Sequence, residues 1–235
     1  MSLAIVYTRA ALGIEAPLIT VEVHLSNGLP GLTMVGLPET TVKEARDRVR
    51  SALINSGYAF PAKKITINLA PADLPKEGGR YDLPIALALL VASEQLNTTR
   101  LNQYEFVGEL ALTGGLRGVP GAIPSAMEAI KAGRRIVVSS DNAAEVGLIG
   151  GSDCLVADHL QEVCAFLAGQ TSLSPPLAEA PARDERYEDL LDVIGQQQGK
   201  RALEIVAAGG HNLLLIGPPG TGKTMLASRL PGLLP

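Results

Sequence analysis

The feature that most constrains this 235-residue chain is an apolar run near its C-terminus that leads into a glycine-rich loop. Residues 213–216 read LLLI, and residues 217–224 read GPPGTGKT, which matches the phosphate-loop pattern G-x-x-x-x-G-K-T. Residues 225–230 (MLASRL) then have the composition of a helix. A strand, a loop and a helix in this order are the context that the pattern needs, so we predict the beginning of a P-loop NTPase α/β domain here.

The residue types of this loop suit a nucleoside triphosphate. Glycines allow backbone turns that are closed to other residues and bring N–H groups close to phosphates, while the lysine ammonium adds a positive charge. A threonine hydroxyl after the lysine can ligate Mg²⁺, and we assign this role to Thr224. The alternative is a glycine-rich turn without a ligand. We predict that ATP is bound by Gly217, Pro218, Pro219, Gly220, Thr221, Gly222, Lys223 and Thr224.

Eleven residues follow Thr224. Hydrolysis of ATP also needs a carboxylate behind the magnesium ion and a group that orients the attacking water, often with an arginine from a neighbouring subunit. We therefore expect the chain to be the front portion of a longer ATPase. On this expectation it contains no catalytic residue and binds ATP without hydrolysing it.

Composition indicates a globular protein, with 46% hydrophobic and 19% charged residues. The net charge is −4 and aromatic residues make up 3%, so binding to nucleic acid would need a local basic patch. Cys154 and Cys164 form no C-x-x-C pair, and we expect both to be buried thiols. The longest uncharged apolar run, residues 83–92, is too short for a membrane span, and no basic leader is seen; we expect a cytoplasmic protein without a membrane partner.

The front of the chain favours an α+β (mixed α/β) fold over a Rossmann-like one, because strands come first and later alternate with helices. Strands predicted at residues 3–7, 18–25 and 31–35 should form an antiparallel meander. A helix from Pro38 to about Gly57 should bury Val42, Ala45, Val49, Ala52 and Leu53. We further predict strands at 65–69 and 135–138, a glycine-rich turn flanked by the apolar pairs 106–107 and 111–112, and helices at 82–96, 125–132, 159–168 and 195–208. A shift to Gln, Ser and Pro predicts the domains 1–168 and 187–235, joined by a linker at 169–186.

Six basic residues against three acidic ones lie between Glu39 and Lys64. One interpretation is a contact with the phosphate backbone of DNA. The alternative, which we favour, is a solvated helix face with intrahelical pairs such as Glu44 with Arg48. The basic residues are Lys43, Arg46, Arg48, Arg50, Lys63 and Lys64.

Several segments resemble a known family. Residues 192–196 (DVIGQ), 200–204 (KRALE) and 209–213 (GGHNL), followed by the phosphate loop, are similar to the start of a magnesium-chelatase-like AAA+ module. Residues 36–46 (GLPETTVKEAR) and 68–80 (NLAPADLPKEGGR) resemble the ComM (YifB) family of bacterial AAA+ proteins. The resemblance, which covers essentially the whole chain, implies a homo-hexameric, ATP-driven DNA helicase that promotes branch migration in recombination and competence. It also places Val193 and Ile194 near the adenine, although both could equally be core residues.

The same resemblance implies that residues 1–168 adopt the ribosomal S5 domain 2-like sandwich of the Lon proteolytic domain. The Lon nucleophile motif would correspond to residues 75–82 (PKEGGRYD), where Arg80 replaces the serine, and residues 118–125 contain no lysine. An arginine is neither a nucleophile nor a general base, which excludes peptidase activity from this position. Arg80 could bind a DNA phosphate or pair with Glu77 or Asp82, and we favour the ion pair.

Two other functions stay open at this point. A magnesium-chelatase-type motor would use ATP to insert a metal into a macrocycle, although a Lon-like front domain argues against it. The front domain could also be an oligomerisation scaffold without a ligand of its own. Our preferred hypothesis is the N-terminal portion of an AAA+ DNA motor, with a proteolytically inactive front domain ahead of an ATP-binding segment.

Overall fold

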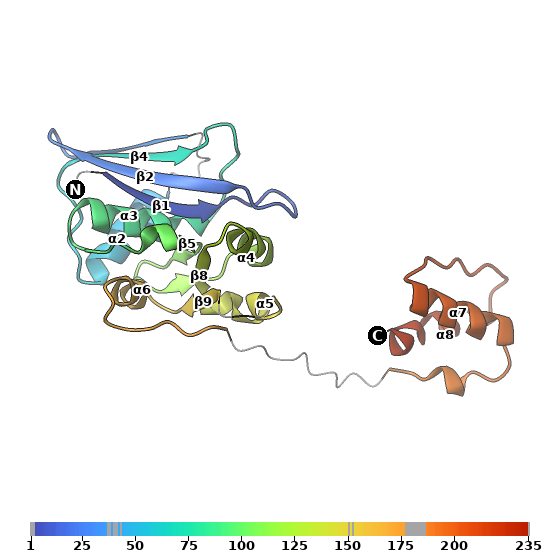
Figure 1. Ribbon diagram of the computed structural model, residues 1–235. Coiled ribbons are helices and arrows are strands. Elements are labelled where there is room, and N and C mark those ends of the chain that lie inside the picture. The colour runs from blue at the N-terminus through green and yellow to red at the C-terminus, as the bar shows by residue number, and fades with distance from the viewer. Residues whose placement is uncertain are drawn as a thin grey trace. The chain divides into compact units, whose positions relative to one another are not determined.

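The computed structural model describes residues 3–36, 39, 42, 44–149, 151, 153–176 and 187–234. The chain forms two compact units, Met1–Glu179 and Ala180–Pro235 (Figure 1). Much of the predicted linker, residues 177–186, lies outside the described ranges. Within those ranges, no helix has the length and apolar character that a bilayer crossing requires.

A seven-stranded sheet forms the centre of the first unit, in the order β3-β4-β2-β1-β5-β8-β9 (Figure 1). Neighbours are antiparallel at β4-β2 and β2-β1 and parallel at the other four contacts, so this is a mixed α/β fold with a mostly parallel sheet. A separate two-stranded sheet contains β6 (Glu109–Leu110) and β7 (Leu116–Arg117). The strands of the large sheet are β1 (Leu3–Arg9), β2 (Leu18–Ser26), β3 (Gly31–Val35), β4 (Lys64–Ala70), β5 (Tyr104–Phe106), β8 (Arg135–Ser139) and β9 (Cys154–Ala157).

The predicted meander of the first three strands is wrong in one respect. The strands β1 and β2 pair as expected, but β4 lies between β2 and β3. The reason is the alternation in β4, whose Ile65, Ile67 and Leu69 are all buried, whereas β3 is half exposed along its length. Placing the more apolar strand inside the sheet and the more polar strand at its edge buries more apolar surface.

Helices cover the sheet in two groups. The first core cluster combines β1, β2 and β4 with α2 (Ala45–Asn55), α3 (Asp82–Ala92) and α6 (Leu160–Leu167). The second combines β8 and β9 with α4 (Ala122–Lys131) and α5 (Ala143–Gly147). Strand β8 shows the division, because Val137 belongs to the first cluster while Ile136 and Val138 belong to the second. This half of the sheet is therefore buried on both faces, as its continuous apolar sequence requires.

Most helices were predicted, but their ends differ. All five core residues predicted for the helix before Gly57 are buried, and α2 begins at Ala45; Pro38, Thr40 and Thr41 lie outside the described residues. Helix α3 ends at Ala92, since Ser93 caps it and Glu94 has a φ of 62°. Sequence reasoning missed β9 and α5, although four apolar residues between Asp153 and Asp158 are a signal for a short buried strand. Both predicted buried thiols are confirmed.

A buried ion network joins the two halves of the sheet. The Glu105 carboxylate of β5 accepts hydrogen bonds from Arg9 Nε (2.6 Å) and Nη2 (2.7 Å) and from Arg134 Nε (2.9 Å). Glu105 is fully buried, and Arg9 also donates to the carbonyl oxygens of Ala16 and Glu128 at 3.0 Å each. The charges therefore lose their water but gain a nearly complete set of partners.

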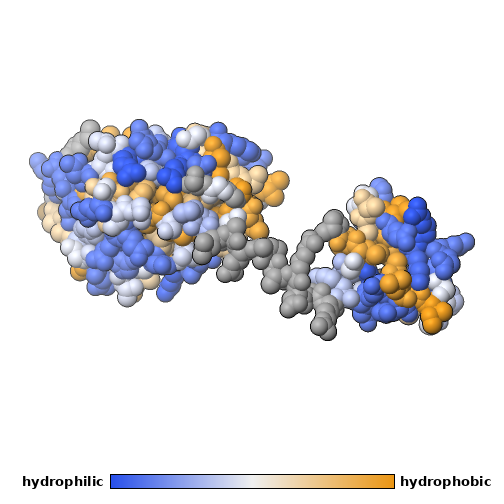
Figure 2. All heavy atoms as spheres, turned by 60° about the horizontal axis from the view of Figure 1, so that its bottom comes forward, coloured by the Kyte–Doolittle hydropathy of each residue, from blue (hydrophilic) through white to orange (hydrophobic). Residues whose placement is uncertain are grey.

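The second unit contains α7 (Gln197–Gly209) and α8 (Lys223–Ala227), packed through Leu190, Val193, Leu203 and Leu226. The helix predicted at 195–208 is confirmed, with its stop at the glycine pair. The strand predicted at 213–216 is absent, and no strand is present between residues 187 and 234 to pair with it. Leu214 is 79% exposed and Ile216 is 85% exposed, and Figure 2 shows apolar side chains gathered on the surface of this unit.

We predict that Glu105→Ala lowers the free energy of unfolding of the first unit by about 3–5 kcal/mol, because it leaves two cations without their carboxylate. Urea denaturation followed by circular dichroism measures this. The control is Glu128→Ala, which removes only the partially exposed pair with Lys131 and should cost less than about 1 kcal/mol. Equal losses of unfolding free energy in the two variants would show that the buried network stabilises the fold no more than an exposed ion pair does.

Candidate functional site

The phosphate loop connects residues 211–216 to α8 and needs glycine at two places. Gly220 and Gly222 have φ angles of +81° and +82°, in the left-handed region that other residues rarely adopt. A Cβ on Gly222 would also lie 3.3 Å from Met225 Cε. Gly222, which the motif fixes, and Gly220, which occupies one of its variable positions, therefore both have a geometric reason to be glycine.

The loop folds around the lysine of the motif. Lys223 Nζ donates hydrogen bonds to the carbonyl oxygens of Gly217 and Pro218, each at 2.8 Å. Thr221 Oγ1 donates to the same Pro218 oxygen at 2.9 Å. The Thr224 side chain is exposed in the first turn of α8. The ammonium group and the Thr224 hydroxyl thus belong to one short, solvent-accessible segment, which is the arrangement that contact with a phosphate and a metal ion would use.

The segment that precedes α7 lies beside this loop. Gln196 Nε2 donates to the carbonyl oxygen of Thr221 at 3.2 Å, and Gln196 itself has a φ of 53°. The two candidate base contacts differ: Val193 is 1% exposed and belongs to the core, while Ile194 is 96% exposed. Of the two, Ile194 has a side chain that is accessible to a ligand, and Val193 anchors the segment that presents it.

One contact in this unit had no signal in the sequence. Arg229, just after α8, forms an ion pair with Glu188 at 2.8 Å, and Ser228 Oγ donates to the same carboxylate at 2.9 Å. The residues are some forty positions apart and follow no periodic pattern, so only the fold brings them together. The contact ties the helix that follows the phosphate loop to the beginning of the unit.

Arg80, which the resemblance to Lon proteases would place at the position of a peptidase nucleophile, lies in the first unit. This side chain is 4% exposed and donates to the carbonyl oxygens of Arg9 (3.2 Å) and Pro120. The predicted ion pair with Glu77 or Asp82 is wrong within the described residues, because the guanidinium group points to main-chain acceptors instead. Burial lowers the pKa of Arg80. The residue is a structural cross-link between the end of β1 and the segment before α4.

A cavity of about 310 Å³ adjoins Arg80. The described residues that line it include no serine, threonine or cysteine. Lys76, the lysine of the same segment, is fully buried and donates to the carbonyl oxygens of Pro71 and Leu74 (2.9 Å for the second). Burial lowers the pKa of Lys76, but its ammonium group holds the loop rather than facing a nucleophile. The cavity therefore lacks the pair of groups that a serine-lysine peptidase needs.

Asp82 pairs with Arg48 instead of Arg80. Arg48 donates from Nε at 2.7 Å and from Nη2 at 3.1 Å, and the Leu110 N–H donates to the same carboxylate at 3.2 Å. Burial raises the pKa of Asp82 to about 6, although the hydrogen bonds and charge of Arg48 act in the opposite direction. The predicted pair of Arg48 with Glu44 is present at 3.9 Å, but the contact with Asp82 is much closer.

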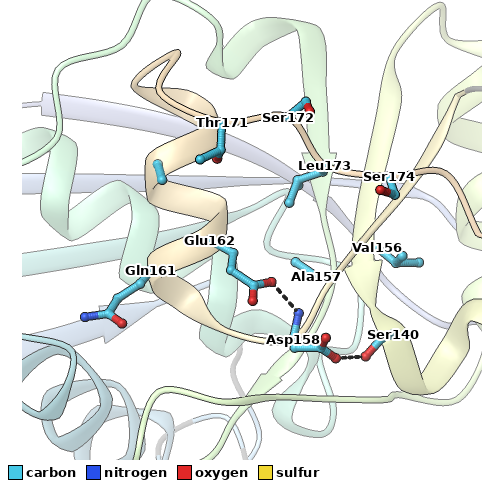
Figure 3. A pocket seen from close by; sticks show the side chains of 11 residues that line it. Ser140, Val156, Ala157, Asp158, Gln161, Glu162, Thr171, Ser172, Leu173 and Ser174 are labelled. Carbon is cyan, nitrogen blue, oxygen red and sulfur yellow. Dashed lines mark hydrogen bonds between the residues drawn. The ribbon is translucent and has the colours of Figure 1, made fainter.

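A larger cavity of about 550 Å³ lies between α6, the end of β9 and residues 171–174 (Figure 3). Its two carboxylates are engaged within its own wall: Ser140 donates to Asp158, and the Asp158 N–H donates to Glu162 at 2.9 Å. No cluster of three His, Cys, Asp or Glu residues suited to a metal ion occurs in the described part of the chain. We assign no ligand to this cavity.

The comparisons with known proteins indicate the same class of protein that the phosphate-loop sequence indicates. Residues 21–142 match the family "Subunit ChlI of Mg-chelatase", and residues 189–235 match "Magnesium chelatase, subunit ChlI". The chain therefore belongs to the magnesium-chelatase-like AAA+ proteins, a family that uses nucleotide and Mg²⁺ in general.

Curated relatives define the branch of this family. The chain is 77% identical over 235 residues to the protein YifB of Salmonella typhimurium and 59% identical over 242 residues to the competence protein ComM of Haemophilus influenzae. Both alignments cover 100% of this chain but 46% and 47% of the relatives. The chain is thus a member of the ComM (YifB) family and spans about half the length of the curated relatives that it matches.

We predict a pH-dependent effect of Asp82→Asn. Because the pKa of Asp82 is raised from 3.8 to about 6 on folding, the stability that its protonated form contributes is complete below pH 3.8 and is lost as the pH rises through 6. The free energy of unfolding of the unchanged chain minus that of the variant should fall by about 2–3 kcal/mol between pH 4 and pH 7. Denaturation at both pH values measures it, and a difference that stays constant or grows contradicts the raised pKa.

Proposed function

We propose that residues 217–224 bind ATP with Mg²⁺ and that the whole protein is an AAA+ DNA motor. The observation that carries the proposal is the phosphate loop wound around Lys223, with the ammonium group held at the loop by two carbonyl oxygens. The relation to a protein named competence protein ComM supports the choice of DNA as the substrate.

Different groups of the loop would contact different parts of the Mg²⁺–ATP complex. Main-chain N–H groups between Gly217 and Gly222 surround the phosphates, Lys223 neutralises the charge of the β- and γ-phosphates, and Thr224 contributes one ligand to Mg²⁺. Ile194 is the candidate contact to the adenine, since it is exposed beside a segment that Gln196 ties to the loop. The Gln196 bond to Thr221 links the segment that carries Ile194 to the phosphate loop.

The remaining parts of the proposal concern the whole protein. We propose that the first unit has the Lon-like, ribosomal S5 domain 2-like fold without peptidase activity, which the arginine in the nucleophile position supports. We further propose a homo-hexamer in the cytoplasm that acts on branched or single-stranded DNA in recombination and competence. In such a ring the first unit would serve as a scaffold, a contact to DNA, or both.

A metal-insertion motor is the second candidate, and the match to magnesium-chelatase subunit families favours it. The two candidates share ATP binding and differ in the substrate. ATP-dependent unwinding of forked DNA by the whole protein supports the first, and ATP-dependent insertion of a metal into a macrocycle supports the second.

We predict that Lys223→Ala weakens ATP binding to the 235-residue chain about 10- to 100-fold, because charge-assisted hydrogen bonds to phosphate contribute about 1.5–3 kcal/mol. Titration of a fluorescent ATP analogue with and without Mg²⁺ measures the affinity. The control is Arg201→Ala, which removes a cation from the exposed surface of α7 and should leave the affinity unchanged. Unchanged affinity in the Lys223 variant would remove the basis of the assignment.

A further inference from the structure

A basic groove lies on the first unit at the outer side of α2. It has a volume of about 260 Å³ and lies between α2, the β3 edge of the sheet and the segment that leads into β4. Three cations and one aromatic ring define what we call the α2 groove: Arg46, Arg50, Lys63 and Phe60. No carboxylate lines it among the described residues.

The cations of the α2 groove are exposed and form no close ion pair in the described chain. Arg46, Arg50 and Lys63 are exposed, and none of them has a carboxylate within ion-pair distance in the described chain, although the charge of Lys63 helps to lower the pKa of Glu94 from further away. This is a different situation from Arg48 on the same helix, whose side chain turns inward to the buried Asp82. Arg46 and Arg50 are four residues apart and therefore lie on one face of α2.

One of the cations is oriented in advance. The Arg50 guanidinium lies over the Phe60 ring, with its central carbon 5.0 Å from the ring centroid. Stacking on an aromatic face restricts the planar guanidinium while leaving its N–H groups available. Arg50 thus loses less conformational freedom on binding an anion than a freely mobile side chain would.

The positive charge of the α2 groove contrasts with the net charge of −4 of the whole protein. Three cations in one groove suit a ligand with several regularly spaced negative charges, and a nucleic-acid backbone is such a ligand. The groove offers little for stacking of unpaired bases, because Arg50 already lies over a face of Phe60. Duplex DNA has the higher charge density, with one negative charge per about 1.7 Å of its axis.

We propose that the α2 groove binds the phosphate backbone of duplex DNA through Arg46, Arg50 and Lys63. The inference deepens the proposed function, on which it rests for the identity of the polymer, by assigning a DNA contact to the first unit. It does not depend on the phosphate loop. Variants of the α2 groove should therefore leave ATP binding unchanged, and Lys223→Ala should leave duplex binding without ATP unchanged, so failure of one proposal is distinguishable from failure of the other.

The test measures binding of a fluorescein-labelled 30-base-pair duplex to the 235-residue chain by anisotropy, at several salt concentrations. Three phosphate contacts predict a slope of log K against log salt of about −2.7, which is a loss of about 40-fold between 50 and 200 mM. Arg46→Glu combined with Lys63→Glu should reduce affinity at 50 mM at least 10-fold and flatten the slope to about −1. This variant keeps Arg50 on Phe60, so the local packing is retained, and circular dichroism checks the fold.

Lys64→Glu is the matched control. Its counterpart is the single variant Lys63→Glu, which removes one phosphate contact and should weaken duplex binding at least about 3-fold. Lys64→Glu makes the same change of charge one residue further along, but Lys64 does not line the groove and instead lies against Gly28. We expect a loss of less than 3-fold for this control. An equal loss of duplex affinity in Lys64→Glu and Lys63→Glu would show that DNA responds to the overall surface charge, and it would overturn the assignment of the contact to the α2 groove.

Two competitors complete the test. A single strand of the same length, at equal phosphate concentration, should displace the duplex less well than unlabelled duplex does. Tighter binding of the single strand overturns the choice of duplex. Displacement by poly-glutamate as effective as that by duplex would assign the α2 groove to acidic polypeptides and overturn the proposal, as would absence of any salt-dependent binding.

Discussion

The first unit depends on the buried carboxylate of Glu105 at the seam between the two halves of its sheet. The strands β1 and β5 meet in parallel through a short register that pairs Tyr7 with Glu105, so few main-chain hydrogen bonds cross this line. The two arginines that bind the carboxylate come from the end of β1 and from the residue before β8, and Arg134 also lies over the Tyr7 ring at 4.7 Å. Side-chain charge thus joins the half of the sheet that contains both antiparallel contacts to the half that is parallel throughout, where few main-chain hydrogen bonds connect them.

The second buried carboxylate organises the helices and, through them, the surface. Asp82 is the first residue of α3, and its bond to Arg48 fixes how α2 lies against that helix. With Arg48 turned inward, the neighbours Arg46 and Arg50 are left on the outer side of α2. The basic character of this segment therefore has two separate physical origins. One arginine stabilises the core, and the others are available to a partner.

Sequence reasoning located what is encoded locally. The phosphate loop, the helix that precedes it and the buried face of α2 follow from spacing within one segment, and all of them are present. Strand order was not encoded in this way, since the insertion of β4 between β2 and β3 depends on comparing the apolar content of distant strands. The partners of Arg80 and Arg48 were missed for the same reason. The Arg80 acceptors lie 71 and 40 positions away, and Asp82 lies 34 positions from Arg48.

The proposed nucleotide site has an energetic consequence that follows from the lysine. Lys223 already donates two hydrogen bonds of 2.8 Å to loop carbonyls, so contact with a phosphate exchanges neutral acceptors for charged ones. The gain is the difference between these acceptors and is smaller than the whole interaction with phosphate. When Lys223 no longer donates to the Gly217 and Pro218 carbonyl oxygens, the Thr221 hydrogen bond to Pro218 remains as a side-chain contact that holds this part of the loop. Binding of a phosphate should therefore rearrange residues 217–221, while α8 remains anchored by Leu226 in the core and by the pair of Arg229 with Glu188.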